Sequence, residues 1–341
     1  MAKLTITDIA RMANVSPSTV SFVLNNRPGI REETRKHVKA IIEQTGYTPN
    51  AHSRRLTLRR SFTIHVVMRH YTSTLFNLFG TDVLMGIFRE SRRLGYNIIF
   101  TSVDEAENIR DSYKYVRETI TSETVDGVMF IQCFDPELLQ LCKDQGLPFL
   151  LVDCNYPKDH SVPLVEVDYY DAALQAANYL ISCGHHDIGF IGTNSMPEFD
   201  RMTFGGFRDA LNAAGLPIRM EWVQKNSDVN VPTPSCMQNI LSCKLRPTAI
   251  LCAADIYAIE AIKQAKKAGF SVPEDISFMG IDDLVVAEYV NPALSTMAMD
   301  KLELGSLSMR QLYAMINKQP CETISLVKTK LCIRDTVYRR K

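Results

Sequence analysis

Short apolar runs alternate with segments of helical periodicity from Phe62 to near the end of the chain. This alternation is typical of parallel β-sheets with helices on both faces. It restricts this part of the chain to the α/β class. The strand-like runs are Thr63 to Met68, Tyr96 to Ser102, Gly127 to Gln132, Pro148 to Asp153, Ile188 to Gly192, Ala249 to Cys252 and Ile276 to Ile281.

A chain of 341 residues with 46% hydrophobic content can bury more than one core. We therefore expect a multidomain protein. The longest apolar runs fall far below the roughly 20 residues that a membrane span needs, and the N-terminus lacks the apolar stretch of a secretory signal. The sequence predicts a cytoplasmic protein without membrane contact.

The nine cysteines are an odd number and fall within apolar stretches, which favours buried, reduced thiols over disulfides. The closest pairs, Cys133 with Cys142 and Cys236 with Cys243, lack the spacing of zinc ligands. We expect no structural metal and no cofactor.

Positive charge is concentrated at the N-terminus. Residues 1–60 hold 11 Lys and Arg against 4 Asp and Glu, whereas the rest holds 27 against 34, although the whole chain is neutral. A small basic head on an acidic body is the pattern expected when only the head contacts a polyanion.

The first predicted helix follows Thr5 and Asp8, which resemble a capping pair. Apolar residues then recur at helical spacing up to Asn14. Asn tolerates the left-handed conformation that a tight turn between two helices requires. We therefore expect a helix followed by a turn.

A second helix is predicted from Ser16, a good N-cap, and Pro17, which suits the first helical position, to about Leu24. A third helix runs from about Glu32 to Gln44 and ends at Gly46. On the second helix, helical spacing directs the apolar residues to one face and directs Ser18 and Phe22 to the opposite, exposed face. The core residues expected on helices two and three are Val20, Val23, Leu24, Val38, Ile41 and Ile42.

These residues resemble the DNA-binding head of the lac repressor/gal repressor family of bacterial transcription regulators. The matching stretches are Thr5 to Ala10, Asn14 to Ser21, Val23 to Asn25 and Gly46 to Asn50. The resemblance implies that the second helix lies in the major groove, where Pro17, Ser18 and Phe22 choose the bases. It implies DNA contacts, mostly to the backbone, by Thr5, Ser16, Ser21, Asn25, Thr34, Tyr47 and Asn50. A helical bundle used for protein contacts is the alternative.

Pro49 fits the start of a short basic helix, the hinge. The resemblance implies that two such helices of a dimer enter the minor groove, that Ser53, Arg54 and Arg55 contact DNA, and that Leu56 wedges between base pairs. The family usually has Ala where this chain has Ser53. The alternative is a solvated basic linker.

The body also resembles this family and, through it, the periplasmic sugar-binding proteins, at Gly184 to Gly192, Arg246 to Cys252 and Val272 to Asp283. The implied fold is a three-helix helix-turn-helix head (1–47) and a hinge helix (48–60) before a two-lobed α/β body with parallel sheets (61–341). The first lobe would span about 61–160 and 292–322, the second about 161–291 and 323–341. Three crossovers would join the lobes, near 153–167, 282–292 and 318–326.

A small-molecule effector is expected between the lobes, outside the carboxyl ends of the strands. Carboxylates with an aromatic platform suit the hydroxyls and apolar faces of a sugar. Asp282 could instead cap the following helix, and Phe79 could be a core residue. The family's ligand-binding Arg usually stands where this chain has Thr203. The expected effector-binding residues are Tyr71, Phe79, Gln132, Asp153, Arg201, Asp255 and Asp282.

Residues Thr323 to Ile333 predict a strand pair, and no leucine heptads follow. A homodimer that binds a pseudo-palindromic double-stranded DNA operator, and represses transcription under effector control, is therefore expected. No nucleotide-binding, metallopeptidase or hydrolase motif follows the predicted strands, so we expect no enzyme. A solute receptor of the same fold and a sugar-processing enzyme are the alternatives.

Overall fold

The computed structural model describes residues 4–24, 27–47, 60–69, 74–103, 109–156, 161–226 and 234–340. The chain forms two compact units, Met1–Phe62 and Thr63–Lys341. The first unit is referred to below as the head and the second as the body.

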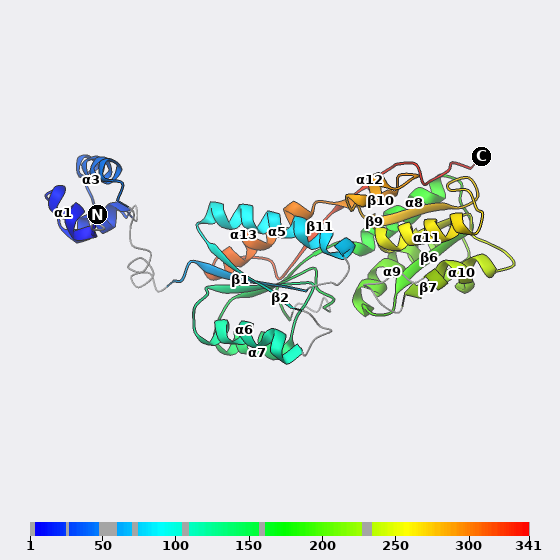
Figure 1. The fold of residues 1–341 in the computed structure, drawn as a ribbon, viewed down its shortest axis with the longest axis horizontal. Helices are drawn as coiled ribbons and strands as arrows, with labels where there is room; N and C mark the ends of the chain where they lie inside the picture. The colour runs from blue at the N-terminus through cyan, green and yellow to red at the C-terminus, as the bar shows by residue number, and fades with distance from the viewer. Residues whose placement is uncertain are drawn as a thin grey trace. The chain divides into compact units, whose positions relative to one another are not determined.

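The head contains the three expected helices, α1 (Ile6–Met12), α2 (Pro17–Leu24) and α3 (Glu32–Thr45), drawn in blue in Figure 1. The capping box at α1 is confirmed, because the side chains of Thr5 and Asp8 each accept a hydrogen bond from the other residue's backbone N–H. Asn14 and Gly46 take the left-handed conformation at φ 53° and 62°. Both turns therefore form where the sequence predicts them.

The head core is small and joins all three helices. Phe22 and Ser18 stay outside this core, as the helical spacing predicts. Leu24, Ile41 and Ile42 pack against it while partly exposed. The core residues are Ile9, Ala10, Ala13, Val20, Val23, Val38 and Tyr47.

The first sheet of the body has the strand order β11-β5-β4-β3-β1-β2, with every pairing parallel. Figure 1 shows α5 (Thr74–Leu94) and α13 (Lys301–Ile316) on one face and α6 (Ile109–Thr121) and α7 (Pro136–Asp144) on the other. The strands are β1 (Thr63–Arg69), β2 (Asn97–Val103), β3 (Gly127–Ile131), β4 (Phe149–Val152), β5 (Leu164–Val167) and β11 (Ile324–Val327).

The second sheet has the order β12-β10-β9-β8-β6-β7 and is parallel except for the antiparallel pairing of β12 with β10. Two helix pairs pack against it, α8 (Tyr169–Ser182) with α9 (Pro197–Ala213), and α10 (Pro234–Ser242) with α11 (Asp255–Lys267). A 3-10 turn, η1 (Met220–Trp222), and a short helix, α12 (Val286–Tyr289), complete this lobe. The strands are β6 (Ile188–Thr193), β7 (Val223–Asn226), β8 (Ala249–Cys252), β9 (Ser277–Asp282), β10 (Ser295–Met299) and β12 (Thr329–Cys332).

All seven predicted strands are present, within one or two residues of their expected ends. Three further strands, β5, β7 and β10, were not predicted, because each is short and carries polar residues among its apolar ones. The expected strand pair near the C-terminus is wrong: β11 and β12 are consecutive but do not pair. β11 pairs with β5 in the first sheet and β12 with β10 in the second.

The chain passes between the two sheets three times: after β5, after β10 and between β11 and β12. The expected lobe boundaries lay near residues 160, 291 and 322, so each crossing falls a few residues later than expected. The crossings come later because, each time, a strand pairs with its neighbour in one sheet before the chain continues into the other lobe.

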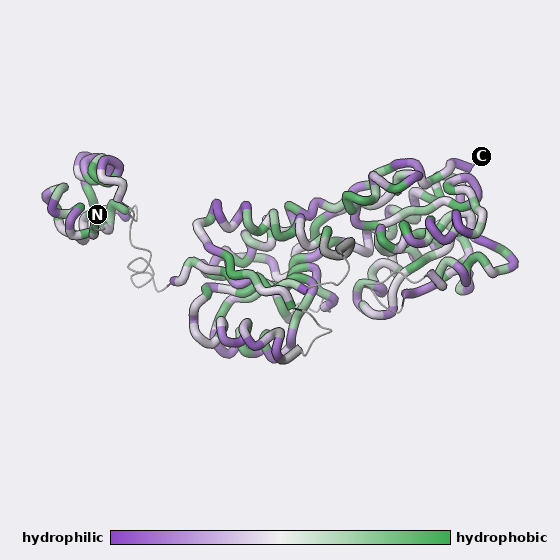
Figure 2. The backbone as a smooth tube through the Cα atoms, in the orientation of Figure 1, coloured by the Kyte–Doolittle hydropathy of each residue, from purple (hydrophilic) through white to green (hydrophobic). Residues whose placement is uncertain are grey.

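The interior of each lobe is built from the sheet strands, and β3, β4 and β8 are buried along their whole length. Figure 2 shows hydrophobic segments running through the interior of both lobes. Helices α8 and α9 come very close at Gly206, where an added Cβ would collide with the carbonyl oxygen of Tyr170. Glycine is needed there because no side chain fits.

Six of the nine cysteines are buried, and all nine are free thiols. Among the helices of the described ranges, none has the length and apolar content to cross a membrane.

Candidate functional site

The head exposes one face of α2 together with its N-terminus. Ser16, Pro17 and Ser18 are exposed, and Phe22 keeps 38% of its surface accessible. The Ser16 hydroxyl accepts a hydrogen bond from the backbone N–H of Thr19 at 3.1 Å. Helix-turn-helix domains contact base edges in the DNA major groove with residues near the N-terminus of their second helix, which is the part of α2 that is exposed here.

A cation lies beside this face, because the Arg27 guanidinium carbon is 5.7 Å from the centroid of the Phe22 ring. Of the other expected DNA contacts, Thr5 is exposed, and Ser21 and Thr34 are partly exposed. Tyr47 is 8% exposed and belongs to the head core, where burial raises its pKa. Six expected contacts lie outside the described residues: Asn25, Asn50, Ser53, Arg54, Arg55 and Leu56.

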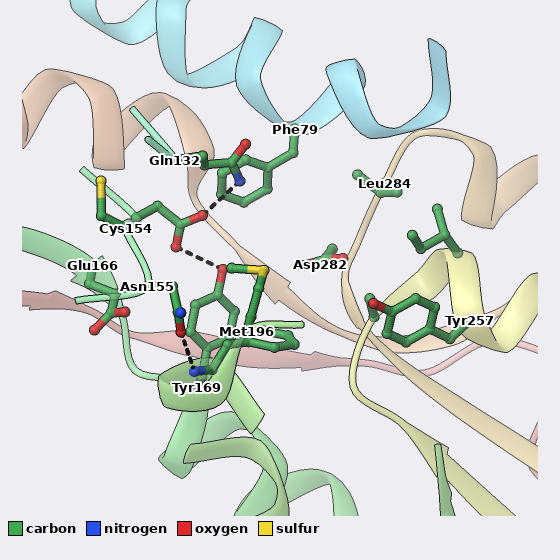
Figure 3. Close-up of a pocket in the computed structure, with 14 residues that line it drawn as sticks. Phe79, Gln132, Cys154, Asn155, Glu166, Tyr169, Met196, Tyr257, Asp282 and Leu284 are labelled. Carbon is green, nitrogen blue, oxygen red and sulfur yellow. Dashed lines mark hydrogen bonds between the residues drawn. The ribbon is translucent and has the colours of Figure 1, made fainter. Parts of the chain in front are cut away.

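A cleft lies between the two lobes of the body and encloses about 700 Å³ of space, open solvent included. Both lobes contribute walls: β3, β4, β5 and α5 from the first, and α8, α9, α11 and β9 from the second (Figure 3). Clefts between lobes or domains are where small-molecule sites preferentially occur. The lining residues are Phe79, Gln132, Asp153, Cys154, Asn155, Glu166, Tyr169, Met196, Phe199, Ala254, Ile256, Tyr257, Asp282 and Leu284.

Three polar residues of the cleft stand at strand ends in the left-handed region. Gln132 follows β3 at φ 55°, Asp153 follows β4 at φ 50°, and Asp282 ends β9 at φ 132°. Residues other than glycine seldom adopt these angles, and such strain is concentrated at functional sites. The backbone here directs polar side chains into the cleft at a cost in stability.

Asp153 is held by two donors. The Gln132 amide donates to one carboxylate oxygen at 2.9 Å, and the Tyr169 hydroxyl donates to the other at 2.8 Å (Figure 3). Tyr169 belongs to the second lobe and Asp153 to the first, so this bond joins the lobes. The Tyr169 ring meets Phe199 edge to face at a centroid distance of 4.8 Å.

Asn155 makes a second link between the lobes. Its side-chain oxygen accepts the backbone N–H groups of Glu198 and Phe199, in the first turn of α9, at 2.8 and 3.1 Å. These N–H groups have no partner within the helix itself. A residue that follows β4 thus completes the hydrogen bonding of a helix in the other lobe.

Two carboxylates of the second lobe belong to this region: Asp282 lines the cleft, and Asp255 is fully buried behind it. Burial raises the pKa of Asp255 to about 6, although its carboxylate accepts hydrogen bonds from Thr296 at 2.6 Å and the Leu284 N–H at 2.8 Å. Burial, and then the charge of Asp255, raise the pKa of Asp282 well above its usual value. Asp282 does not cap α12, which has no side-chain cap.

The structure brings four of the expected effector residues together in the cleft: Phe79, Gln132, Asp153 and Asp282. Asp255 lies behind the lining and holds the loop after β9 through Leu284. Arg201 is not a lining residue; its exposed guanidinium pairs with Glu198 at 2.9 Å. Tyr71 lies outside the described residues.

Thr203, where the family usually has Arg, is buried and donates to the Phe199 carbonyl at 2.9 Å. The sequence did not point to Glu166, Tyr169, Phe199 or Tyr257. Glu166 lies in β5 and Tyr169 follows it, and β5 is one of the three strands that were not predicted. Tyr257 stands two residues after Asp255. The end of the strand before α11, which pointed to Asp255, could also have pointed to Tyr257. No cluster of three or more His, Cys, Asp or Glu suited to a metal occurs in the described part of the chain.

A three-helix head with a helix-turn-helix and a two-lobed α/β body with an interlobe cleft define a DNA-binding regulator with an effector domain. Residues 5–50 match the family described as bacterial regulatory proteins, lacI family, and residues 177–337 match the periplasmic binding protein-like domain. The chain is 30% identical over 343 residues to the ribose operon repressor of Haemophilus influenzae, and the match covers 99% of each chain. The protein therefore belongs to the lacI family of transcriptional regulators.

Other relatives agree with this assignment. Catabolite control protein A of Priestia megaterium is 29% identical over 94% of this chain and 95% of its own. The fold matches the lac repressor dimer bound to operator and the anti-inducer ONPF, with a TM-score of 0.75, 22% identity and coverage of 99% and 100%. It also matches the complex of the transcriptional regulator CelR with cellobiose, with a TM-score of 0.72, 24% identity and coverage of 98% and 99%.

Proposed function

We propose that this chain is a homodimeric repressor that binds a pseudo-palindromic operator, and that a sugar or sugar derivative in the interlobe cleft controls its operator affinity. The observation that carries the proposal is the make-up of the cleft. Its lining comes from both lobes, so a ligand that contacts both walls favours one arrangement of the lobes over others. A ligand with such a preference shifts any equilibrium linked to that arrangement.

Carboxylates beside aromatic rings support a sugar as the ligand. Asp153 and Asp282 accept hydrogen bonds, while Phe79 and Tyr257 offer apolar faces. The names of two relatives also refer to sugars: one is a ribose operon repressor, and the other was solved in complex with cellobiose.

Exposed apolar side chains on the body support a second copy as partner. Val285 and Tyr289, at α12, expose 60% and 79% of their surface, and Met85 and Phe88 on α5 are also exposed. Two heads in a dimer would face two half-sites, as in the lac repressor dimer on its operator. The hinge at residues 48–60, with Leu56 as its wedge, belongs to the same proposal.

The first test selects binding sites for the full-length protein from a random DNA library and then titrates the selected site by fluorescence anisotropy, with and without sugars. We expect a two-fold symmetric site whose affinity changes about 5- to 150-fold with one ligand, the usual range of allosteric coupling. If no sequence is enriched over random DNA, the chain is not an operator-binding repressor. If a site is enriched but no small molecule changes its affinity, effector control fails.

Asp282→Ala separates the two activities. We expect normal operator affinity without ligand, because the cleft lies in the body, and loss of the ligand response. Glu274→Ala, which removes an exposed carboxylate outside the cleft lining, is the control. A folded Asp282→Ala protein that responds at the normal ligand concentration would remove Asp282 from the site.

A further inference from the structure

The exposed face of α2 ends beside a cation that is not among the DNA contacts expected from the sequence. The guanidinium carbon of Arg27 lies 5.7 Å from the centroid of the Phe22 ring, and both residues are exposed. A ring face attracts a guanidinium, so the contact favours one position of the charge over the many that a free Arg side chain can reach. The charge of Arg27 therefore lies on the exposed side of α2.

The main chain of Arg27 is fixed by hydrogen bonds to two helices. Its N–H donates to the Phe22 carbonyl oxygen at 2.9 Å, and its own carbonyl oxygen accepts the guanidinium of Arg35, on α3, at 2.7 Å. Pro28 follows, and the residue before a proline is restricted to extended conformations. Although Arg27 lies outside both helices, its backbone is thereby tied to α2 and α3.

The charge of Arg27 is not used by the acidic residues of the described head. Arg11 pairs with Asp8 at 3.4 Å. Arg35 pairs with Glu32 at 3.8 Å. Neither of these ion pairs in the described part of the head involves Arg27, and an aromatic ring supplies no oxygen acceptor. The guanidinium of Arg27 keeps its N–H donors for a ligand, and their planar arrangement fits the oxygens of a phosphate.

The place of Arg27 at the end of α2 favours a phosphate over a base. Helix-turn-helix domains direct the N-terminal residues of this helix at the base edges. The eight residues of α2 span about 12 Å at about 1.5 Å per residue, and the major groove is about 12 Å wide. Arg27 follows the opposite end, after Leu24, so its side chain is expected at the wall of the groove, where the phosphates lie.

We propose that Arg27 contacts one DNA phosphate at each half-site and that the Phe22 ring positions it for this contact. The inference rests on the proposed operator binding and adds a residue to it. Phe22 acts here as a positioning residue, because its ring limits where the guanidinium lies. A phosphate contact fixes the orientation of α2 on the duplex without choosing a base. This role of Phe22 does not depend on whether its ring also touches a base.

Arg27→Gln in the full-length protein tests the phosphate contact. Fluorescence anisotropy gives its affinity for the selected operator, and for a duplex of random sequence, at several salt concentrations. A dimer loses two contacts, so the slope of log affinity against log salt on the operator should fall by about 1.8, twice the value for one phosphate. From about 50 to about 200 mM salt, the unchanged protein should then lose about 12 times more affinity than the variant.

Two further variants separate this contact from charge in general. Lys39→Gln also removes one exposed cation, but Lys39 lies on α3, about 140° around that helix from Thr34, and we expect a smaller change in slope. Arg27→Lys keeps the charge and loses the planar group, so the slope should stay while the affinity falls. Both main-chain bonds of Arg27 survive in its variants, and the melting temperature of each variant checks the fold.

A double-mutant cycle tests the role of Phe22. Phe22→Leu removes the ring and keeps an apolar side chain. Its cost in operator affinity should be about two- to fivefold larger when Arg27 is present than in the Arg27→Gln protein, which is the size of an exposed contact between a cation and a ring. Additive effects of the two changes would reject the positioning role of Phe22.

The remaining outcomes count against the phosphate contact. If Arg27→Gln keeps the slope of the unchanged protein, or changes it no more than Lys39→Gln does, the contact is absent while operator binding stands. If sites selected by folded Arg27→Gln lose a preferred guanine, Arg27 reads a base and the phosphate assignment is wrong. If the unchanged protein binds neither duplex, the inference and the proposed operator binding are both rejected.

Discussion

Phe22 lies on the exposed face of α2, where the family often carries Arg, and it has no donor for guanine. Its ring can press against a thymine methyl, and Pro17 beside it also lacks a hydrogen-bonding side chain. If these three residues face the bases, Ser18 is the one polar reader among them. We therefore expect direct readout by the head to be sparse, with DNA shape and the hinge carrying more of the specificity.

Phe22→Arg is expected to move the preferred half-site toward guanine at one position by about 1–3 kcal/mol, the size of a bidentate base contact. Selection from a random library with both proteins measures the change. Phe22→Ala is the control, because it removes the ring without adding a donor. Identical half-sites from a folded Arg variant would show that Phe22 reads no base.

The raised pKa of Asp282 makes the stability of the protein depend on pH. At a pH below 3.8, the ordinary pKa of an Asp side chain, the Asp282 carboxyl is protonated in both the folded and the unfolded protein. As pH rises above that value, the unfolded chain releases the proton first, so stability falls until the pH passes the raised folded pKa. The free protein accordingly loses stability with rising pH on account of this group.

Asp282→Asn should therefore raise the melting temperature at pH 8 and change it much less at pH 4. Thermal unfolding of the two proteins across this range, each without ligand, measures the difference. Glu274→Gln supplies the comparison for loss of an exposed charge. A stabilisation of equal size at both pH values would mean that ionisation of Asp282 does not destabilise the fold.

At the scale of elements, the contact of α8 with α9 depends on one glycine and not on its neighbour. A Cβ at Gly206 would meet the carbonyl oxygen of Tyr170 and the N–H of Leu174, both backbone atoms of α8. A Cβ at Gly205 would meet only the Tyr170 ring, at an ordinary 3.6 Å. Both glycines lie within α9, but only Gly205 has room for a Cβ atom.

Gly205→Ala is expected to stabilise the protein by up to about 1 kcal/mol, from helix propensity alone. Gly206→Ala gains the same propensity but forces the helices apart, and it should cost roughly 1–3 kcal/mol net, as overpacked sites do. Chemical denaturation of both variants provides the comparison. Equal stability of the two would refute the close approach of α8 and α9.

Elements with contiguous apolar residues were predictable from the sequence, and those defined by distant partners were not. β3 and β8 are uninterrupted apolar runs, so local patterning identifies them. β11 and β12 look alike as strands, but which sheet each joins depends on β5 and β10. A local pattern holds no information about a partner more than 30 residues away in the chain.

The same distinction between local pattern and distant partners applies to the residues of the cleft. Gln132, Asp153 and Asp282 were predictable because each stands at the carboxyl end of a parallel strand, where ligands of α/β proteins bind. Tyr169 and Glu166 depend on the placement of β5, and Arg201 was expected in the cleft on sequence proximity alone. Its pairing with Glu198, three residues earlier on the same helix, is a local contact that the family resemblance did not reveal.

For the whole molecule, the charge asymmetry predicts which part binds DNA and how salt affects it. Operator affinity should fall steeply with salt, by about 0.9 log units per log unit of salt for each phosphate contact. A chain beginning at Ser61 should lose operator binding but keep ligand binding. Anisotropy at several salt concentrations, with calorimetry on the shortened chain, tests both. Operator binding by the shortened chain would exclude the head as the DNA-reading unit.

The three crossings between the lobes impose an order on synthesis. The head is complete after about 60 residues and forms its own compact unit, whereas the first lobe lacks α13 and β11 until residue 327 has been made. At roughly 5–20 residues per second, the ribosome needs some tens of seconds for that interval. During this time the nascent chain carries a folded head, and α5 lacks the helix that covers it. A message truncated before α13 would yield a head on an unfinished body, a species that cannot respond to any effector and that chaperones and proteases would remove.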